Sequence, residues 1–323
     1  MTMIMIITMI IIIIMIITII ILIRRNNNNN KKTLVIVLGE TRAHELTFNS
    51  FKMNVIDVLN ADLCLCIGVK KDYDYSNPFY KLAKYKFLYD EPEDYSSAFD
   101  YANEIIMKNN NYKSSHLNWR EFLKIKDQFL GGIKDSHNQH PGSGGILIFY
   151  RWFLLKNLIE NNLIDKYDRF IITRSDFIYQ LHHPDVIRMN GDYIWIPDGE
   201  DYGGYTDRHV VLSPKTIESY LNILTNMIMN SNDYYNKMIE LNRNDWNLEK
   251  MVKFNLEYNK VNHLVRFMPY IMYSVRNING STSWSKGIYS NTHNYYIKYM
   301  TEYDSSTEHK NKYTKDFYNN LYS

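Results

Sequence analysis

An Arg-Ser-Asp triplet, Arg174-Ser175-Asp176, directly follows an apolar run that has the composition of a buried strand. The Asp176 carboxylate can hold a divalent cation, and the Arg174 guanidinium group can pair with a phosphate or orient Asp176. A diphosphate carries about two negative charges, which a protein neutralises through a bound cation or through Arg and Lys side chains. The triplet therefore indicates a diphosphate-binding site, with a purely structural Arg–Asp pair as the alternative.

Two carboxylates lie downstream of the triplet, each in a place with an ordinary structural role. Asp207 lies in the Gly-rich segment 203–208, where it can cap a turn. Glu249 lies in the first turn of an expected helix, where the helix dipole favours an acidic residue in any case.

Two arginines and two Gly-containing turns complete the candidate set. Gly39 and Arg42 follow the first expected strand, where Arg42 can be a surface residue. Arg151 lies on the expected helix 146–161, where it can form a surface salt bridge. The segment 142–145 (Gly-Ser-Gly-Gly) precedes that helix and could receive a phosphate at its N-terminus, but it lacks the Lys-Ser/Thr ending of a P-loop.

Short β-branched runs and longer amphipathic runs predict an α/β domain that positions these residues. Residues 33–38 and 62–69 read as buried strands on either side of an amphipathic helix over 46–59. This order predicts a βαβ unit, with ligands bound at the carboxyl ends of the strands. We further expect strands over 166–173, 192–197 and 210–213, helices over 97–108, 117–130, 146–161, 217–241 and 246–259, and an irregular segment over 72–95.

Composition excludes some classes of partner and site. Lys+Arg number 37 against 35 Asp+Glu, so the net charge of +2 gives no electrostatic reason to expect a nucleic-acid partner. Cys64 and Cys66 are two apart in an expected strand, so both side chains point to the same face. We interpret them as two buried apolar residues, not as a disulfide or a metal site.

The first 23 residues contain no charged side chain, no Pro and no Gly. A helix of this length reaches about 34 Å, which covers a bilayer core of about 30 Å. We predict a retained transmembrane anchor over 1–23 that contacts the lipid bilayer through residues 3–23, because a basic n-region and a cleavage site are absent. A low-complexity tract from a wrongly chosen start codon is the alternative.

The division of the chain follows from this anchor: residues 24–32 form a polar linker, 33–300 the globular domain and 301–323 a loosely ordered polar tail. The positive-inside rule would place the domain in the cytoplasm, because the basic residues near the span follow it. These residues are Arg24, Arg25, Lys31 and Lys32.

Four segments in order resemble the GT-A family of glycosyltransferases, in particular the branch in bacterial surface-polysaccharide enzymes and large DNA viruses. The first holds an opening strand, a Gly-x-x-Arg loop and a helix, and the second a strand ending in the equivalent of Asp-x-Asp. The third resembles an acceptor-side Gly-Gly-x-x-Asp-Arg segment, and the fourth an acidic residue that opens a helix. They are 37–42 with 54–55 and 61–63, 166–176, 196–208, and 247–249.

The resemblance implies a GT-A (Rossmann-like) fold with a mixed, mostly parallel sheet flanked by helices, preceded by the N-terminal transmembrane helix. It implies a nucleotide-sugar-dependent glycosyltransferase that moves a sugar from its donor co-substrate to a hydroxyl of a glycan or glycoprotein. Asp176 would bind Mn²⁺ or Mg²⁺. Asp207 or Glu249 would be the catalytic base if the enzyme inverts, since direct displacement needs one base near the acceptor hydroxyl. Asp201 is a weaker candidate for binding the acceptor. The implied nucleotide-binding residues are Gly39, Arg42, Arg151, Arg174 and Asp176.

The chain departs from the family pattern at Arg174, which occupies the first acidic position of Asp-x-Asp. One carboxylate holds a divalent ion less firmly than two, so this departure bears directly on metal dependence.

The resemblance also implies a single-pass membrane protein, in a host endomembrane or viral-factory membrane if the chain is viral. Many membrane-tethered glycosyltransferases face the lumen, which conflicts with the charge pattern, so the side of the membrane stays open.

Two rival functions follow from the same pattern. A nucleotide-cofactor oxidoreductase or a methyltransferase is disfavoured, because the first strand ends in Gly39-Glu40-Thr41-Arg42 and not in G-x-G-x-x-G. A catalytically inactive, membrane-tethered protein of the same fold that binds nucleotide-sugars or glycans stays open.

Overall fold

The computed structural model describes residues 31–111, 117–125, 128–134, 142–241, 246–280, 282 and 285–322. The predicted anchor over 1–23 and most of the predicted linker lie outside these residues. Among the residues described, no helix combines the length and the apolar character needed to cross a bilayer.

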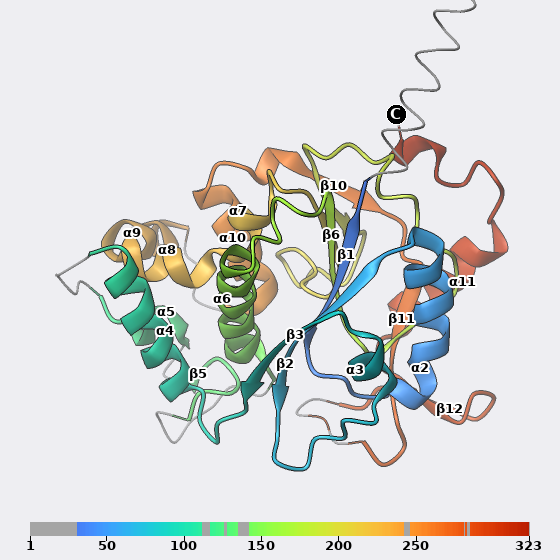
Figure 1. Ribbon diagram of the computed structural model, residues 1–323, viewed down its shortest axis with the longest axis horizontal. Coiled ribbons are helices and arrows are strands. Elements are labelled where there is room, and N and C mark those ends of the chain that lie inside the picture. Colours follow the sequence, from blue (N-terminus) through green and yellow to red (C-terminus); the bar gives the residue numbers. More distant parts are fainter. Residues whose placement is uncertain are drawn as a thin grey trace, which may run out of the picture.

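A seven-stranded sheet with the order β10-β8-β9-β6-β1-β2-β3 lies at the centre of the protein (Figure 1). Only β9 runs antiparallel to its neighbours, so the sheet is mixed and mostly parallel. This confirms the predicted sheet type. Its strands are β1 Thr33–Gly39, β2 Asp62–Val69, β3 Tyr85–Asp90, β6 Arg169–Thr173, β8 Ile194–Pro197, β9 Val210–Leu212 and β10 Val265–Met268.

Helices cover both faces of this sheet, because the side chains of its strands alternate between two apolar cores. In β1, Leu34 and Ile36 belong to one core and Val35 and Val37 to the other. The first core is covered by α4 Ser96–Asn109, α5 Trp119–Leu123, α6 Gly144–Glu160, α7 Ile217–Leu221, α8 Ile223–Met229, α9 Ser231–Glu240 and α10 Leu248–Tyr258. The second is covered by α2 His44–Phe51, the π-helix η1 Lys52–Asp57 and α3 Pro78–Leu82.

A smaller sheet has the order β12-β13-β11-β7, and its strands β7 and β11 contribute to the second apolar core. Its β7 starts immediately after Asp176 and pairs antiparallel with β11, which ends at Arg276. The pairing brings these two residues, 100 positions apart, to the same place. The strands are β7 Phe177–Tyr179, β11 Met272–Arg276, β12 Ile288–Ser290 and β13 Tyr295–Ile297. The remaining elements are the hairpin β4 Lys124–Ile125 and β5 Gln128–Phe129, and the 3₁₀ turns η2 Asn262–Leu264 and η3 Asn319–Leu321.

Several expected elements differ from those observed. The expected helix over 217–241 is divided into α7, α8 and α9, and the expected helix over 117–130 contains only α5 before the β4–β5 hairpin. The segment 72–95, expected to be irregular, contains α3 and the edge strand β3. An edge strand needs no continuous apolar run, and the residues of β3 range from buried to exposed.

The predicted loose tail over 301–323 is wrong. Residues Met300–Asn311 form helix α11, which packs against β11, and its Glu302 and Ser306 side chains are fully buried. Tyr318 and Leu321 return to the second apolar core. The domain therefore extends well beyond residue 300. The polar composition of α11 concealed its burial, because its inward contacts are hydrogen bonds and an ion pair.

Cys64 and Cys66 lie on β2 with no exposed surface, and both are free thiols in the same apolar core. The prediction of two buried apolar residues is confirmed.

Candidate functional site

A cavity of about 1100 Å³ opens at the carboxyl ends of β1, β2 and β6. The loops that follow these strands line it, together with the first residues of α6 and α10. This is the edge of a parallel sheet at which ligands are expected. Gly142, Ser143 and Gly144 contribute to the wall, and the Ser143 side chain makes no capping hydrogen bond to α6.

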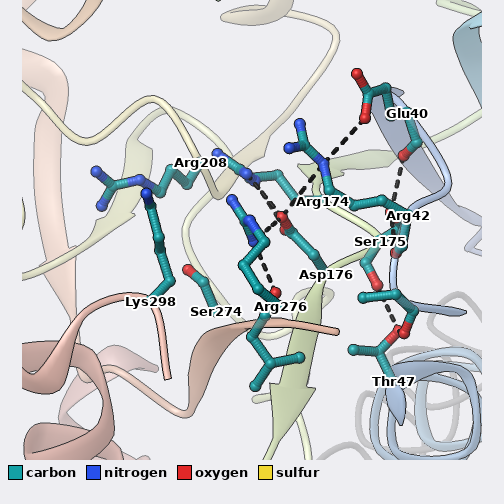
Figure 2. A network of polar contacts seen from close by, with 12 residues as sticks. Glu40, Arg42, Thr47, Arg174, Ser175, Asp176, Arg208, Ser274, Arg276 and Lys298 are labelled. Atoms are coloured by element: carbon teal, nitrogen blue, oxygen red, sulfur yellow. Dashed lines mark hydrogen bonds and ion pairs between the residues drawn. The ribbon is translucent and has the colours of Figure 1, made fainter. Parts of the chain in front are cut away.

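The loop after β1 and the loop after β6 are joined by Ser175. Its hydroxyl group lies 2.8 Å from the carbonyl oxygen of Glu40 and 3.1 Å from that of Arg42, and can donate to either. The hydroxyl group of Thr47 in turn donates to the Ser175 carbonyl oxygen at 2.6 Å (Figure 2). Gly39 makes the turn out of β1 at φ +102°, a conformation that strongly favours glycine. These bonds set the spacing between Arg42 and the Arg174–Asp176 segment.

Three guanidinium groups converge on Asp176, whose side chain is 1% exposed. Arg174 donates from Nε to Oδ1 at 2.9 Å and from Nη2 to Oδ2 at 2.7 Å. Arg276 donates from Nη1 to Oδ2 at 2.5 Å, and Arg42 Nε lies 3.7 Å from the same oxygen (Figure 2). Both carboxylate oxygens of Asp176 are therefore occupied by protein cations.

Burial alone would raise the pKa of Asp176, but Arg174 and Arg276 hold it well below the ordinary value for an aspartate. The same pairing raises the pKa of Arg174 against the opposing effect of burial. Asp176 is thus ionised at any physiological pH and anchors the guanidinium groups around it.

A divalent cation at Asp176 does not fit this geometry. A cation there would have to displace guanidinium groups from both oxygens and would remain close to their positive charges. Within the described parts of the chain, no cluster of three or more His, Cys, Asp and Glu side chains could hold a metal ion. The N–H groups around Asp176 are those expected for a carboxylate that binds arginines.

Another part of the cavity lining comes from the segment that contains Asp207 and from the start of α10. A Cβ atom on Gly204 would lie 2.0 Å from the Glu249 carbonyl group, so only glycine permits this close approach. The Tyr205 amide donates to the Glu249 carbonyl oxygen at 3.1 Å, and the Asn247 side chain caps α10 by accepting from an amide at 2.8 Å. Asp207 and Glu249 consequently line the same cavity.

The pKa of Glu249 is raised to about 7, first by burial and then by the negative charge of Asp207. Arg208, whose Nη2 atom lies 3.8 Å from Glu249 Oε1, partly offsets this effect. A carboxylate with a pKa near neutrality can accept a proton from a substrate at physiological pH. Asp201, the weaker candidate, is exposed and does not line the cavity.

Arg151 does not lie where the sequence interpretation placed it. Its side chain is fully buried within the first apolar core and is not among the residues that line the cavity. Its guanidinium group donates to the backbone carbonyl oxygens of Leu147 at 3.3 Å and Asp207 at 3.2 Å, and lies 5.7 Å from the Tyr220 ring centre. Arg151 therefore holds the Asp207 segment in place instead of facing a nucleotide.

The sequence interpretation gave no role to three basic residues that line the cavity, namely Arg208, Arg276 and Lys298. Arg208 is 4% exposed and pairs with the buried Glu302 at 3.2 Å and with Glu200 at 3.6 Å. The one signal in the sequence for Arg276 is its position: like Arg174, it directly follows a run with strand character.

Comparisons with known proteins add little. No protein-family model matches this chain, and no curated protein matches it in sequence. Among solved structures, apo mouse xyloside xylosyltransferase 1 is similar at a TM-score of 0.36 and 9% identity, covering 74% of this chain and 85% of its own. A similarity of that size carries no weight for function, which has to be inferred from the site itself.

Proposed function

We propose that this chain is a glycosyltransferase of the GT-A type that moves a sugar from a nucleotide-sugar donor to a hydroxyl group of a glycan or glycoprotein. One observation carries the proposal: a single cavity is lined both by a cluster of basic side chains and by the Asp207–Glu249 carboxylate pair. Its volume of about 1100 Å³ suits a ligand as large as a nucleotide-sugar. The order of the four GT-A-like segments supports the same function.

The basic side chains and the Asp207–Glu249 pair have different tasks in an inverting transfer. Glu249, with its raised pKa, takes the proton of the acceptor hydroxyl as the hydroxyl oxygen forms a bond to the anomeric carbon. The bond between that carbon and the diphosphate oxygen breaks, and its electron pair stays on the diphosphate. The cluster of basic side chains stabilises this developing charge, because its N–H donors are already held in place before the reaction.

The membrane anchor over residues 1–23 is part of the proposal, with the apolar length of that segment as its support. It would hold the catalytic domain beside a membrane-bound acceptor. Carbonate extraction of membranes from cells that express the full chain tests it, since a peripheral protein would be released into the soluble fraction.

The function is tested with the full-length chain in detergent micelles, incubated with a panel of UDP- and GDP-sugars. We expect slow donor hydrolysis in the absence of an acceptor and transfer when glycan acceptors are added. A protein that neither turns over any donor nor gains thermal stability with one would refute the proposal. Thermal stabilisation by a donor without any turnover would instead support the inactive binding protein.

A further inference from the structure

Four basic side chains that line the cavity, Arg42, Arg174, Arg276 and Lys298, share two carboxylate partners, Asp176 and Glu40, in the described ion pairs. Arg174, Arg276 and Arg42 share the single carboxylate of Asp176, and only Arg42 has a second acidic contact, to Glu40 at 3.1 Å. Asp176 and Arg276 are 1% and 4% exposed, so water screens this excess poorly. A buried excess of positive charge beside an open cavity indicates an anionic ligand.

Donors remain for that ligand after the internal bonds are counted. Arg174 uses Nε and Nη2 for Asp176 and keeps Nη1. The buried Nε of Arg276 has no hydrogen-bond partner, and Arg42 engages its two acidic neighbours through Nε alone. All three residues line the cavity. Guanidinium groups with unused N–H donors match the oxygens of a phosphate in geometry and charge.

Lys298 lies close to these arginines, and both burial and their positive charge lower its pKa (Figure 2). Burial, followed by the charges of Arg276, Arg174, Arg208 and Arg42 in that order, lowers its pKa to about 8. Lys298 Nζ donates to the Ser285 carbonyl oxygen, which leaves its other N–H donors for an anion in the cavity that it lines.

We propose that the cavity binds the diphosphate of its nucleotide ligand directly, through Arg42, Arg174, Arg276 and Lys298, without a divalent cation. Asp176 is a positioning residue that holds the guanidinium groups. The identification of the diphosphate as a leaving group rests on the proposed function, but the anion site itself rests on the charges and donors around Asp176. Positive side chains here supply the neutralisation that a carboxylate-bound cation would otherwise provide.

The test is calorimetric titration of the full-length chain in detergent with pyrophosphate, UDP and GDP, once in EDTA and once in Mn²⁺. We expect each dissociation constant to agree within about threefold between the two buffers, because both carboxylate oxygens of Asp176 already bind arginines and are not open to a metal ion. Binding of pyrophosphate and both nucleotides that disappears in EDTA and returns with Mn²⁺ would overturn the inference. So would the absence of binding in either buffer.

Two substitutions of similar size separate the site from general charge effects. Lys298→Met should weaken pyrophosphate binding about tenfold or more, as expected for the loss of a charge-assisted hydrogen bond. Lys215→Met is the control, because Lys215 is an exposed lysine paired with Asp192 and does not line the cavity. Equal effects of the two substitutions would refute the assigned site. Thermal melts of both variants confirm that they are folded.

The outcomes also separate this inference from the proposed function. Tight pyrophosphate binding in EDTA without sugar transfer from any donor would keep the anion site and remove the glycosyltransferase. Transfer that requires Mn²⁺ would keep the glycosyltransferase and remove direct binding by the arginines.

Discussion

Replacement of Glu249 by Gln tests the proposed division of the cavity most directly. The amide cannot accept the acceptor proton, and general-base catalysis contributes about 10²–10⁴-fold to a rate, so kcat/KM for transfer should fall by that factor. Pyrophosphate binding should not weaken, because the substitution keeps the size of the side chain and removes a negative charge from the cavity. Glu257→Gln on the same helix is the matched control, since Glu257 does not line the cavity and should retain full activity.

The pH dependence of kcat/KM for transfer gives a second, quantitative test of Glu249. Glu249 acts as a base only when ionised, so kcat/KM should rise with pH through about 7 and then level off. Asp207→Asn removes the negative charge that helps to raise this pKa, so the rise should move to lower pH. A drop of about one unit would increase the ionised fraction at pH 6 from about one tenth to about one half.

The assay is kcat/KM between pH 5 and pH 9, normalised to each variant's plateau so that a general loss of activity does not obscure the shift. Two results would refute the reasoning. One is transfer by Glu249→Gln within threefold of the unsubstituted protein. The other is an Asp207→Asn profile whose rise stays at the original pH.

Three further predictions concern the neighbouring structure. Pyrophosphate affinity should fall as pH rises through about 8, because Lys298 loses its proton there, and calorimetry in a pH series measures this. Glu302→Gln should lower the free energy of unfolding in urea by about 3 kcal/mol, because the buried Arg208 loses a charged partner. Gly204→Ala should reduce kcat/KM about 100-fold by displacing the first turn of α10, whereas Gly280→Ala, with room for a Cβ, should not.

The sequence was informative where a signal is local. Strands β1 and β2 and helix α6 have apolar runs of the right length, and each was predicted within two residues of its observed ends. The division of 217–241 into three helices was missed, because the breaks contain neither Pro nor Gly. Helix α11 was missed because what buries it, the contacts of Glu302 with Arg208 and Ser274, joins distant parts of the chain.

The candidate site divides in the same way. The position after a strand predicts a site at Arg174, and the GT-A resemblance implies Arg42, Asp207 and Glu249; all four line one cavity. Lys298 was not found, because the contacts between β11 and β13 that bring it there have no local signature. Arg151 was placed wrongly for a related reason. Its helix is apolar almost all round, which indicates burial on every side, and a charge on such a helix serves an internal contact.

The arginine at position 174 changes which ion the triplet can bind. With an acidic residue at position 174, a second carboxylate would lie beside that of Asp176, and their repulsion would favour a bound cation between them. Arginine there inverts the local charge and occupies Asp176 through two hydrogen bonds. Arg276 then completes the pairing from a strand that the second sheet places alongside. A single substitution of this kind would not neutralise a diphosphate by itself. It can do so here because Arg42, Arg276 and Lys298 already converge on the same wall, so Asp176 orders the cations that meet the ligand.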